Sequence, residues 1–113
     1  MKIVKDKISI KELKDIAAKS FGNLVKAVVD VEREIMAIDG ELHSDEEALL
    51  LENGSKQQNL WGINLYPEIE TDEWIEFDSI INLRPSMGNK TRGVDNPEIR
   101  EKIVKIVNKL VER

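Results

Sequence analysis

The residues between the last predicted strand and the last predicted helix have the composition of an anion-binding loop. The stretch "LRPSMGNKTRGVDNPEIR" covers residues 83–100 and contains Gly88 and Gly93, whose backbone freedom can expose N–H groups. It leads into a helix that starts at Asn96, where the partial positive charge of a helix N-terminus favours anions. Two arginines, one lysine and three neutral side chains add donors: Arg84, Ser86, Asn89, Lys90, Thr91 and Arg92.

Two observations weaken this interpretation. The glycine spacing matches neither the phosphate-binding P-loop nor the dinucleotide fingerprint. Asp95 and Glu98 flank the start of the helix and would compete with an incoming anion. The alternative is a solvated loop that only connects a strand to a helix. Both interpretations stay open, because binding residues concentrate on loops.

The single histidine offers a second kind of chemistry. His43 lies in "GELHSDEE", among carboxylates, and could act as a general base or help to hold a divalent metal ion in a hydrolase. The sequence has no HxH or HExxH spacing, and acidic residues in the first turn of a helix are stabilising in their own right. The carboxylates that could act together with His43 are Asp30, Glu32, Asp45 and Asp78.

Nucleophilic catalysis and thiolate chemistry have little support. The chain has no cysteine, which excludes disulfides, thiol catalysis and thiolate zinc sites. Ser44, Ser79 and Ser86 do not lie in a GxSxG elbow, and only one histidine is present to activate them. We therefore predict no cofactor, and an enzymatic activity is less favoured than a binding function.

The charges are distributed unevenly along the chain. Residues 1–33 carry eight Lys/Arg and five Asp/Glu, residues 34–83 carry one and thirteen, and residues 84–113 carry eight and four. An acidic middle with basic ends could support head-to-tail homo-oligomerisation or attract a charged ligand, although the segments could also neutralise one another in the fold. The overall net charge of −5 makes nucleic acid an unlikely partner.

These side chains must be positioned by a small α+β domain. The length of 113 residues suits one domain, 1–113. Residues 2–5, 25–32, 34–43, 61–66 and 73–84 have strand patterns, and Asp39-Gly40 predicts a hairpin into a short extra strand. In the segment 73–84, residues Ile75, Phe77, Ser79, Ile81 and Leu83 alternate onto one face.

Three helices are predicted from their caps. Ser9 with Glu12 and Ser44 with Glu47 have capping-box spacing, so helices start near Ile10 and Asp45. Asn96 and Pro97 open the last helix. The element order is β-α-β-β-α-β-β-α, which predicts a largely antiparallel sheet of four to five strands with helices packed on it, in part the ferredoxin-like order.

Neither a signal peptide nor a membrane-spanning run is evident, so we expect no membrane partner and a cytoplasmic location. The strings "IMAIDGELHSDEEALLLENGS", "LWGINLY" and "EFDSIINLRPSMGNKTRGVDNPEIR" resemble a small prokaryotic family described only as a conserved domain of unknown function. This resemblance covers nearly the whole chain and implies no activity. We therefore expect a domain that binds a small anionic ligand or an acidic partner through residues 84–93, with a homo-oligomerising module and a metal-dependent hydrolase as the alternatives.

Overall fold

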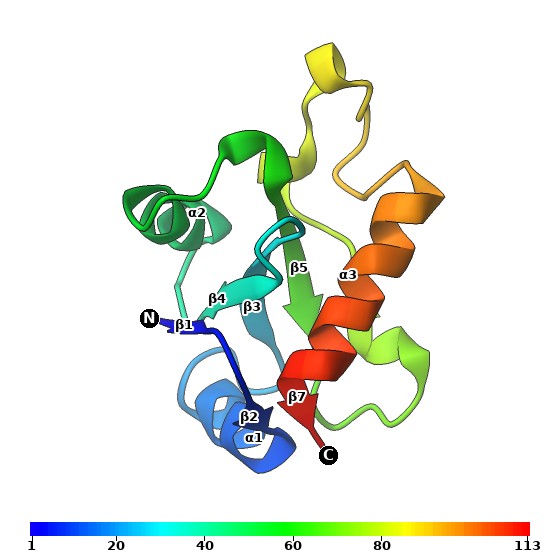
Figure 1. The fold of residues 1–113 in the computed structure, drawn as a ribbon. Coiled ribbons are helices and arrows are strands. Elements are labelled where there is room, and N and C mark those ends of the chain that lie inside the picture. The colour runs from blue at the N-terminus through cyan, green and yellow to red at the C-terminus, as the bar shows by residue number, and fades with distance from the viewer.

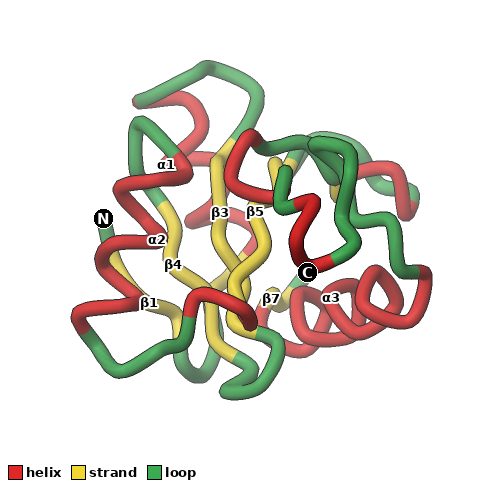
Figure 2. The backbone as a smooth tube through the Cα atoms, turned by 90° about the horizontal axis from the view of Figure 1, so that it is seen from above, coloured by secondary structure: helices red, strands yellow, loops and turns green.

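An antiparallel sheet forms the centre of the computed structural model, which describes residues 1–113. Its strands are β1 (Lys2–Val4), β3 (Val25–Asp30), β4 (Ile35–Ile38), β5 (Leu60–Leu65) and β6 (Ile75–Glu76). The order across the sheet is β1-β4-β3-β5-β6, and all neighbouring strands are antiparallel. Figure 2 shows the first four strands side by side in this order.

Helices and short turns complete the fold. The α-helices are α1 (Ile10–Lys19), α2 (His43–Glu52) and α3 (Pro97–Leu110), and none of them is long and apolar enough to cross a membrane. A separate parallel pair joins β2 (Ile8–Ser9) to β7 (Val111–Glu112). The 3-10 turns are η1 (Gln57–Asn59), η2 (Asp72–Trp74), η3 (Ile80–Asn82) and η4 (Pro85–Met87). The predicted α+β class and the largely antiparallel sheet are confirmed.

The helices cover both faces of the sheet because of the way the strands are connected. β1 leads through α1 to β3, with β4 between them, and β4 leads through α2 to β5, with β3 between them. Both crossovers move in the same direction across the sheet but leave from antiparallel strands, so right-handed connections must pass over opposite faces. The first unit has the split βαβ form of the predicted ferredoxin-like order, whereas the second brings β5 beside β3 and α2 to the other face.

The two faces carry cores of very different size. A cluster of 20 buried apolar residues fills the face under α1 and α3, and it includes Val29 of β3. A cluster of 5 lies under α2 and includes Val28, whose side chain points to the opposite face. In Figure 1, α3 runs along β5 while α2 lies at the other side of the molecule. The small core under α2 leaves room for polar residues at this interface.

The predicted caps of the first and last helices are confirmed. The Ser9 hydroxyl accepts a hydrogen bond from the Glu12 N–H, and the Asn96 side chain accepts one from the Glu98 N–H, so each satisfies a free donor of its helix. Lys109 lies in the last turn of α3, near its negative end. The buried side chains of α3 are Ile103, Ile106, Val107 and Leu110, each of which contributes about 1.5–3 kcal/mol when fully buried.

The predicted boundaries of α2 are wrong at the N-terminal end. The helix begins at His43 rather than Asp45, and its N-cap is Leu42, whose side chain forms no capping hydrogen bond. Ser44 therefore lies inside the first turn. The extra strand predicted after Asp39-Gly40 does not form, because the chain enters the helix directly, with Asp39 in the left-handed region at a φ of 66°.

The long strand predicted for residues 73–84 is also wrong, since β6 is the only strand there, followed by an isolated bridge between Arg84 and Asn89. Beyond β6 the side chain of Asn82 replaces a strand partner for β5: its Oδ1 accepts from the Gly62 N–H at 2.8 Å and its Nδ2 donates to the Gly62 carbonyl at 2.9 Å. Gly62 has no room for a side chain, since an added Cβ would lie 2.6 Å from Ser79 Oγ. The alternating apolar pattern thus comes from turns packed on the sheet rather than from a strand.

Candidate functional site

Arg84, the first residue of the predicted anion loop, is held by backbone carbonyls. Its guanidinium donates to the carbonyls of Gln57 at 2.7 Å and Leu60 at 2.8 Å, and it lies 4.3 Å from the centroid of the Trp61 ring. Burial lowers the pKa of Arg84. Ser86 lies exposed on η4 and forms no hydrogen bond within the chain. Arg84 therefore fastens the loop to the start of β5.

Asn89 organises the middle of the loop from a buried position. Its Nδ2 donates to the carbonyls of Asn82 at 2.7 Å, Thr91 at 3.1 Å and Gly93 at 2.8 Å. Its Oδ1 accepts from the Asp95 N–H at 2.8 Å. The side-chain amide uses its donors and its acceptor inside the loop, so it has a structural role in this conformation.

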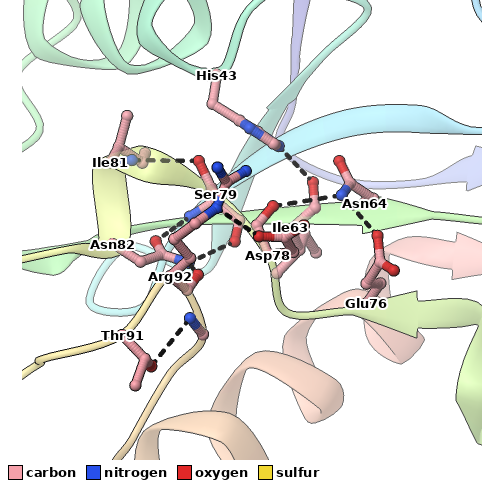
Figure 3. Close-up of polar contacts among 12 residues, drawn as sticks. His43, Ile63, Asn64, Glu76, Asp78, Ser79, Ile81, Asn82, Thr91 and Arg92 are labelled. Atoms are coloured by element: carbon pink, nitrogen blue, oxygen red, sulfur yellow. Dashed lines mark hydrogen bonds and ion pairs between the residues drawn. The ribbon is translucent and has the colours of Figure 1, made fainter.

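The side chains of Thr91 and Arg92 and the backbone N–H of Lys90 donate to carboxylates of the same chain. Asp95 accepts from the Lys90 N–H at 2.7 Å and from the Thr91 hydroxyl at 2.5 Å, and these hydrogen bonds lower the pKa of Asp95. Arg92 Nε donates to Asp78 Oδ1 at 2.8 Å (Figure 3). The structure therefore brings Asn89, Lys90 and Thr91 together around Asp95, while Arg84 and Arg92 point to other partners.

The carboxylates proposed as partners of His43 do not gather around it. Asp30 is fully buried and fixes the turn after β3: Oδ1 accepts from the Glu32 and Arg33 N–H groups, each at 2.9 Å, and Oδ2 accepts from the Ser55 hydroxyl at 2.6 Å. Glu32 Oε2 accepts from Asn59 Nδ2 at 2.6 Å. No three histidine, aspartate or glutamate side chains converge on a point that could hold a metal ion.

His43 is nevertheless placed at an unusual position, between α2 and the sheet. Its Nε2 lies 2.8 Å from the Ile63 carbonyl, and the ring reaches from α2 toward β5 (Figure 3). Burial lowers the pKa of His43, and this effect outweighs the hydrogen bond to the Ile63 carbonyl and the nearby Asp78 charge, both of which act in the opposite direction. Asn64 lies beside it and donates to Glu76 Oε1 at 2.8 Å, while Asn64 Oδ1 is buried without a partner.

Glu46 is the second ionisable residue on this face of α2. It is fully buried, and its Oε2 accepts from the Gly40 N–H at 2.9 Å. Its Oε1 has no hydrogen-bond partner. Desolvation raises the pKa of Glu46 to about 9, so the side chain is a neutral carboxylic acid at neutral pH. The buried stripe of α2 is thus His43, Glu46 and Leu50, two ionisable residues out of three.

An open pocket of about 660 Å³ has Gly40, whose N–H donates to Glu46, among its lining residues. It opens between the C-terminal end of α1, the start of β3 and the connection from β4 to α2. Gly40 links the pocket to Glu46, since a Cβ at this glycine would lie 2.6 Å from Glu46 Cγ. The residues that line the pocket are Lys19, Ser20, Phe21, Lys26, Asp39, Gly40, Glu41 and Leu42.

Three groups bring positive charge to this pocket: the side chains of Lys19 and Lys26 and the start of α2. The partly buried Lys26 places its Nζ 5.0 Å from the centroid of the Phe21 ring and forms no salt bridge. The lining segment ends at Leu42, the uncapped start of α2, where the N–H groups of His43 and Ser44 donate to no acceptor in the chain. Such a helix start carries a partial positive charge.

A family model described as "Protein of unknown function (DUF5674)" matches residues 2–110. The chain belongs to the DUF5674 family. This confirms the resemblance to a family of unknown function, while the prokaryotic origin stays a prediction. No curated protein and no solved structure matches the chain. Membership in DUF5674 brings no activity with it, so function must be argued from the residues themselves.

The sequence contained one signal for this site in the DUF5674 chain. His43, Glu46 and Leu50 have the i, i+3, i+7 spacing of a single helix face. The same window places Asp45 on the opposite face, whereas Glu47 shares the face of His43 and is partly buried, so a helix buried through Leu50 also brings a histidine and a glutamate toward the sheet. Lys26 and Gly40 could not be joined to this stripe from the sequence, because their approach depends on the order of the strands.

Proposed function

We propose that the chain binds a small molecule carrying an anionic group in the pocket formed by residues 19–21, Lys26 and residues 39–42. The observation that supports this most directly is the position of Glu46, fully buried and uncharged behind the pocket wall at Gly40. Buried ionisable residues with perturbed pKa values, when they lie beside a cavity, are typical of functional sites.

The protonation of Glu46 determines the charge available to a ligand. An ionised glutamate at this position would neutralise the nearby Lys26. Because Glu46 is protonated at neutral pH, the ammonium of Lys26 keeps its charge for an incoming carboxylate or phosphate. The free N–H groups of the first turn of α2 add hydrogen-bond donors in the same region.

The other lining residues narrow the class of ligand further. Asp39 and Glu41 supply acceptors and negative charge, so they suit hydroxyl or amino groups on the ligand. Phe21 and Leu42 are 44% and 55% exposed and supply apolar surface. The set favours a small anionic molecule that also carries hydrogen-bond donors and an apolar part.

The loop 84–93 is the alternative anion site. In its favour, its donors already hold one carboxylate, that of Asp95. An external anion would have to displace this carboxylate and the Asp78 partner of Arg92. The pocket at Lys26 requires no such displacement, and we therefore prefer it.

Nuclear magnetic resonance on the ¹⁵N-labelled chain tests the proposal. Inorganic phosphate, sugar monophosphates, nucleoside monophosphates and hydroxycarboxylates are titrated one at a time. We expect saturable shifts at the amides of Gly40, His43 and Ser44 with at least one of these probes. Lys26→Met keeps the apolar stem of the side chain and should abolish the shifts, since it removes the charge.

Lys90→Met and Arg92→Ala are the matched controls in the loop. Both should leave binding at the pocket unchanged. The proposal fails if no probe causes saturable shifts at the pocket, or if Lys26→Met binds as well as the parent chain. Shifts confined to residues 84–95 and lost in Arg92→Ala would assign anion binding to the loop instead.

A further inference from the structure

The residues from Ile80 to Lys90 form a projection with an apolar and cationic surface. In Figure 1 this yellow segment extends beyond the rest of the molecule at one end. Ile80, Leu83 and Met87 are 61%, 42% and 46% exposed; Ile80 lies on η3, Leu83 ends it, and Met87 lies on η4. Exposed apolar residues gathered in one segment are typical of protein interaction sites.

The charge of this projection, which we call the tip (residues 80–90), is positive only. It contains Arg84 and Lys90 and no acidic residue. Neither residue forms a salt bridge within the chain, and the same holds for Lys56, which precedes the carbonyl of Gln57 bound by Arg84. Because the guanidinium of Arg84 is already bound to the carbonyls of Gln57 and Leu60, the cations that remain available at the tip are Lys90 and the neighbouring Lys56, both exposed.

The opposite charge occurs in the loop "PEIETDE", residues 67–73, which we call the acidic loop. Glu70, Asp72 and Glu73 form no salt bridge within the chain, while Glu68 pairs weakly with Lys14 at 3.7 Å. An exposed apolar residue lies among these carboxylates, since Ile69 is 38% exposed. The acidic loop thus complements the tip in charge and also offers an apolar contact.

The backbone of the acidic loop is anchored to the body of the protein. The Ile69 carbonyl accepts from Arg113 Nη2 at 3.3 Å, and the Tyr66 N–H donates to the Trp74 carbonyl at 2.8 Å. A loop that is fixed at both ends loses little conformational freedom when a partner binds, which favours association.

We propose that the chain associates head to tail with a second copy of itself, the tip of one copy docking on the acidic loop of the next. Figure 1 places the tip and the acidic loop at opposite ends of the molecule, whose longest extent is 38 Å, so one chain cannot join its own two surfaces. Contacts between two different surfaces of identical chains are heterologous, and they build open rows or rings. Opposite charges steer the encounter and fix its orientation, and the apolar residues are buried between them.

Light scattering coupled to size-exclusion chromatography, run over a series of concentrations, tests this inference. At low salt the weight-average mass should rise with concentration, and it should fall toward the monomer mass at high salt because exposed charges are screened. A tip variant, Ile80→Ser with Lys90→Ser, should stay monomeric. An acidic-loop variant, Glu70→Lys with Glu73→Lys, should stay monomeric as well.

The decisive measurement mixes the two variants. Each variant keeps one intact surface, so the mixture should form a one-to-one heterodimer and nothing larger. A parent chain that is monomeric at every concentration overturns the inference, and so does a mixture that shows no heterodimer. If either variant alone still dimerises, the contact is symmetric and the head-to-tail arrangement is wrong. Far-ultraviolet circular dichroism establishes that both variants are folded.

Discussion

The N–H of Gly40 donates to Glu46 Oε2 at 2.9 Å, and the same glycine lies so close to this side chain that an added Cβ would come within 2.6 Å of Glu46 Cγ. This contact fixes the connection from β4 to α2 against the buried face of the helix. The backbone at Gly40 also lies between the neutral carboxylic acid of Glu46 and the pocket. Both consequences can be measured.

Glu46→Gln should change the pH dependence of stability. The pKa of Glu46 is raised from 4.5 to about 9 in the folded chain, so between these values the folded state binds one more proton than the unfolded state. The free energy of unfolding therefore falls as pH rises through this window. The contribution of Glu46 to stability is fully present only below the ordinary pKa of 4.5. From about pH 7 to about pH 9 the loss should be on the order of 2 kcal/mol.

Glutamine keeps the shape of the side chain and an acceptor for the Gly40 N–H but does not ionise. Urea unfolding of Glu46→Gln at a series of pH values should give a flatter profile over the same range. The lowered pKa of His43 acts in the opposite direction and below its ordinary value of 6.5, so it does not mask the effect. Parallel profiles for the parent chain and Glu46→Gln would contradict the assignment of a buried neutral acid.

Gly40→Ala should destabilise the chain by about 1–3 kcal/mol, because the new methyl group overlaps Glu46 Cγ and approaches Met1 Sδ. Gly93→Ala is the comparison and should cost less, since its Cβ would meet the carbonyl oxygen of Phe77 at 3.3 Å, a tight contact without the overlap that occurs at Gly40. Thermal and urea unfolding give the difference. In a chain that already carries Glu46→Ala, Gly40→Ala should cost less free energy of unfolding, because Glu46 Cγ is gone. Equal costs in the presence and absence of Glu46→Ala would show that the clash is not with Glu46.

Asp30→Ala should cost about 2–4 kcal/mol of stability, because it leaves the buried Ser55 hydroxyl and the N–H groups of Glu32 and Arg33 without their acceptor. Asp45→Ala, at an exposed position, should change the free energy of unfolding by less than about 0.5 kcal/mol. Chemical unfolding measures both variants. If Asp30→Ala were as stable as Asp45→Ala, the side chain of Asp30 would not be needed for the fold. It would then be free for another role, including the metal-binding role that the sequence suggested.

Asn89→Ala should loosen the loop 84–93, because it removes three donated hydrogen bonds and the acceptor for the Asp95 N–H. We expect a loss of about 2 kcal/mol and faster amide hydrogen exchange in this loop. Asn89→Asp should be at least as damaging, since a carboxylate would face three carbonyl oxygens. Unchanged exchange in Asn89→Ala would contradict the role of this side chain.

Local signals were sufficient to predict α1 and α3 from the sequence. Ser9, Asn96 and Pro97 act within one turn of the chain, so their meaning does not depend on the rest of the fold. The alternation in β3 also marked the strand correctly. It did not reveal that both faces of β3 are covered, which depends on the path of the crossover through α2.

The errors arose where a distant side chain replaces a local rule. Asn82 supplies the hydrogen bonds to Gly62 that a backbone strand would have made, and the spacing of apolar residues cannot predict such a contact. Likewise α2 begins without a side-chain cap at Leu42, so the Ser44 and Glu47 spacing pointed two residues too late. The candidate loop was found by composition, but the internal partners of Arg84 and Arg92 come from segments far away in sequence.

The position of α3 has a consequence for synthesis of the chain. The helix leaves the ribosome after α1, α2 and the strands of the sheet, and it supplies Ile103, Ile106, Val107 and Leu110 to the main core. Until these residues emerge, one face of the sheet, with Val29, Ile63 and Leu65, has only α1 to cover it. A nascent chain that stalls before residue 97 therefore presents a wide apolar surface, the kind of surface that chaperones bind.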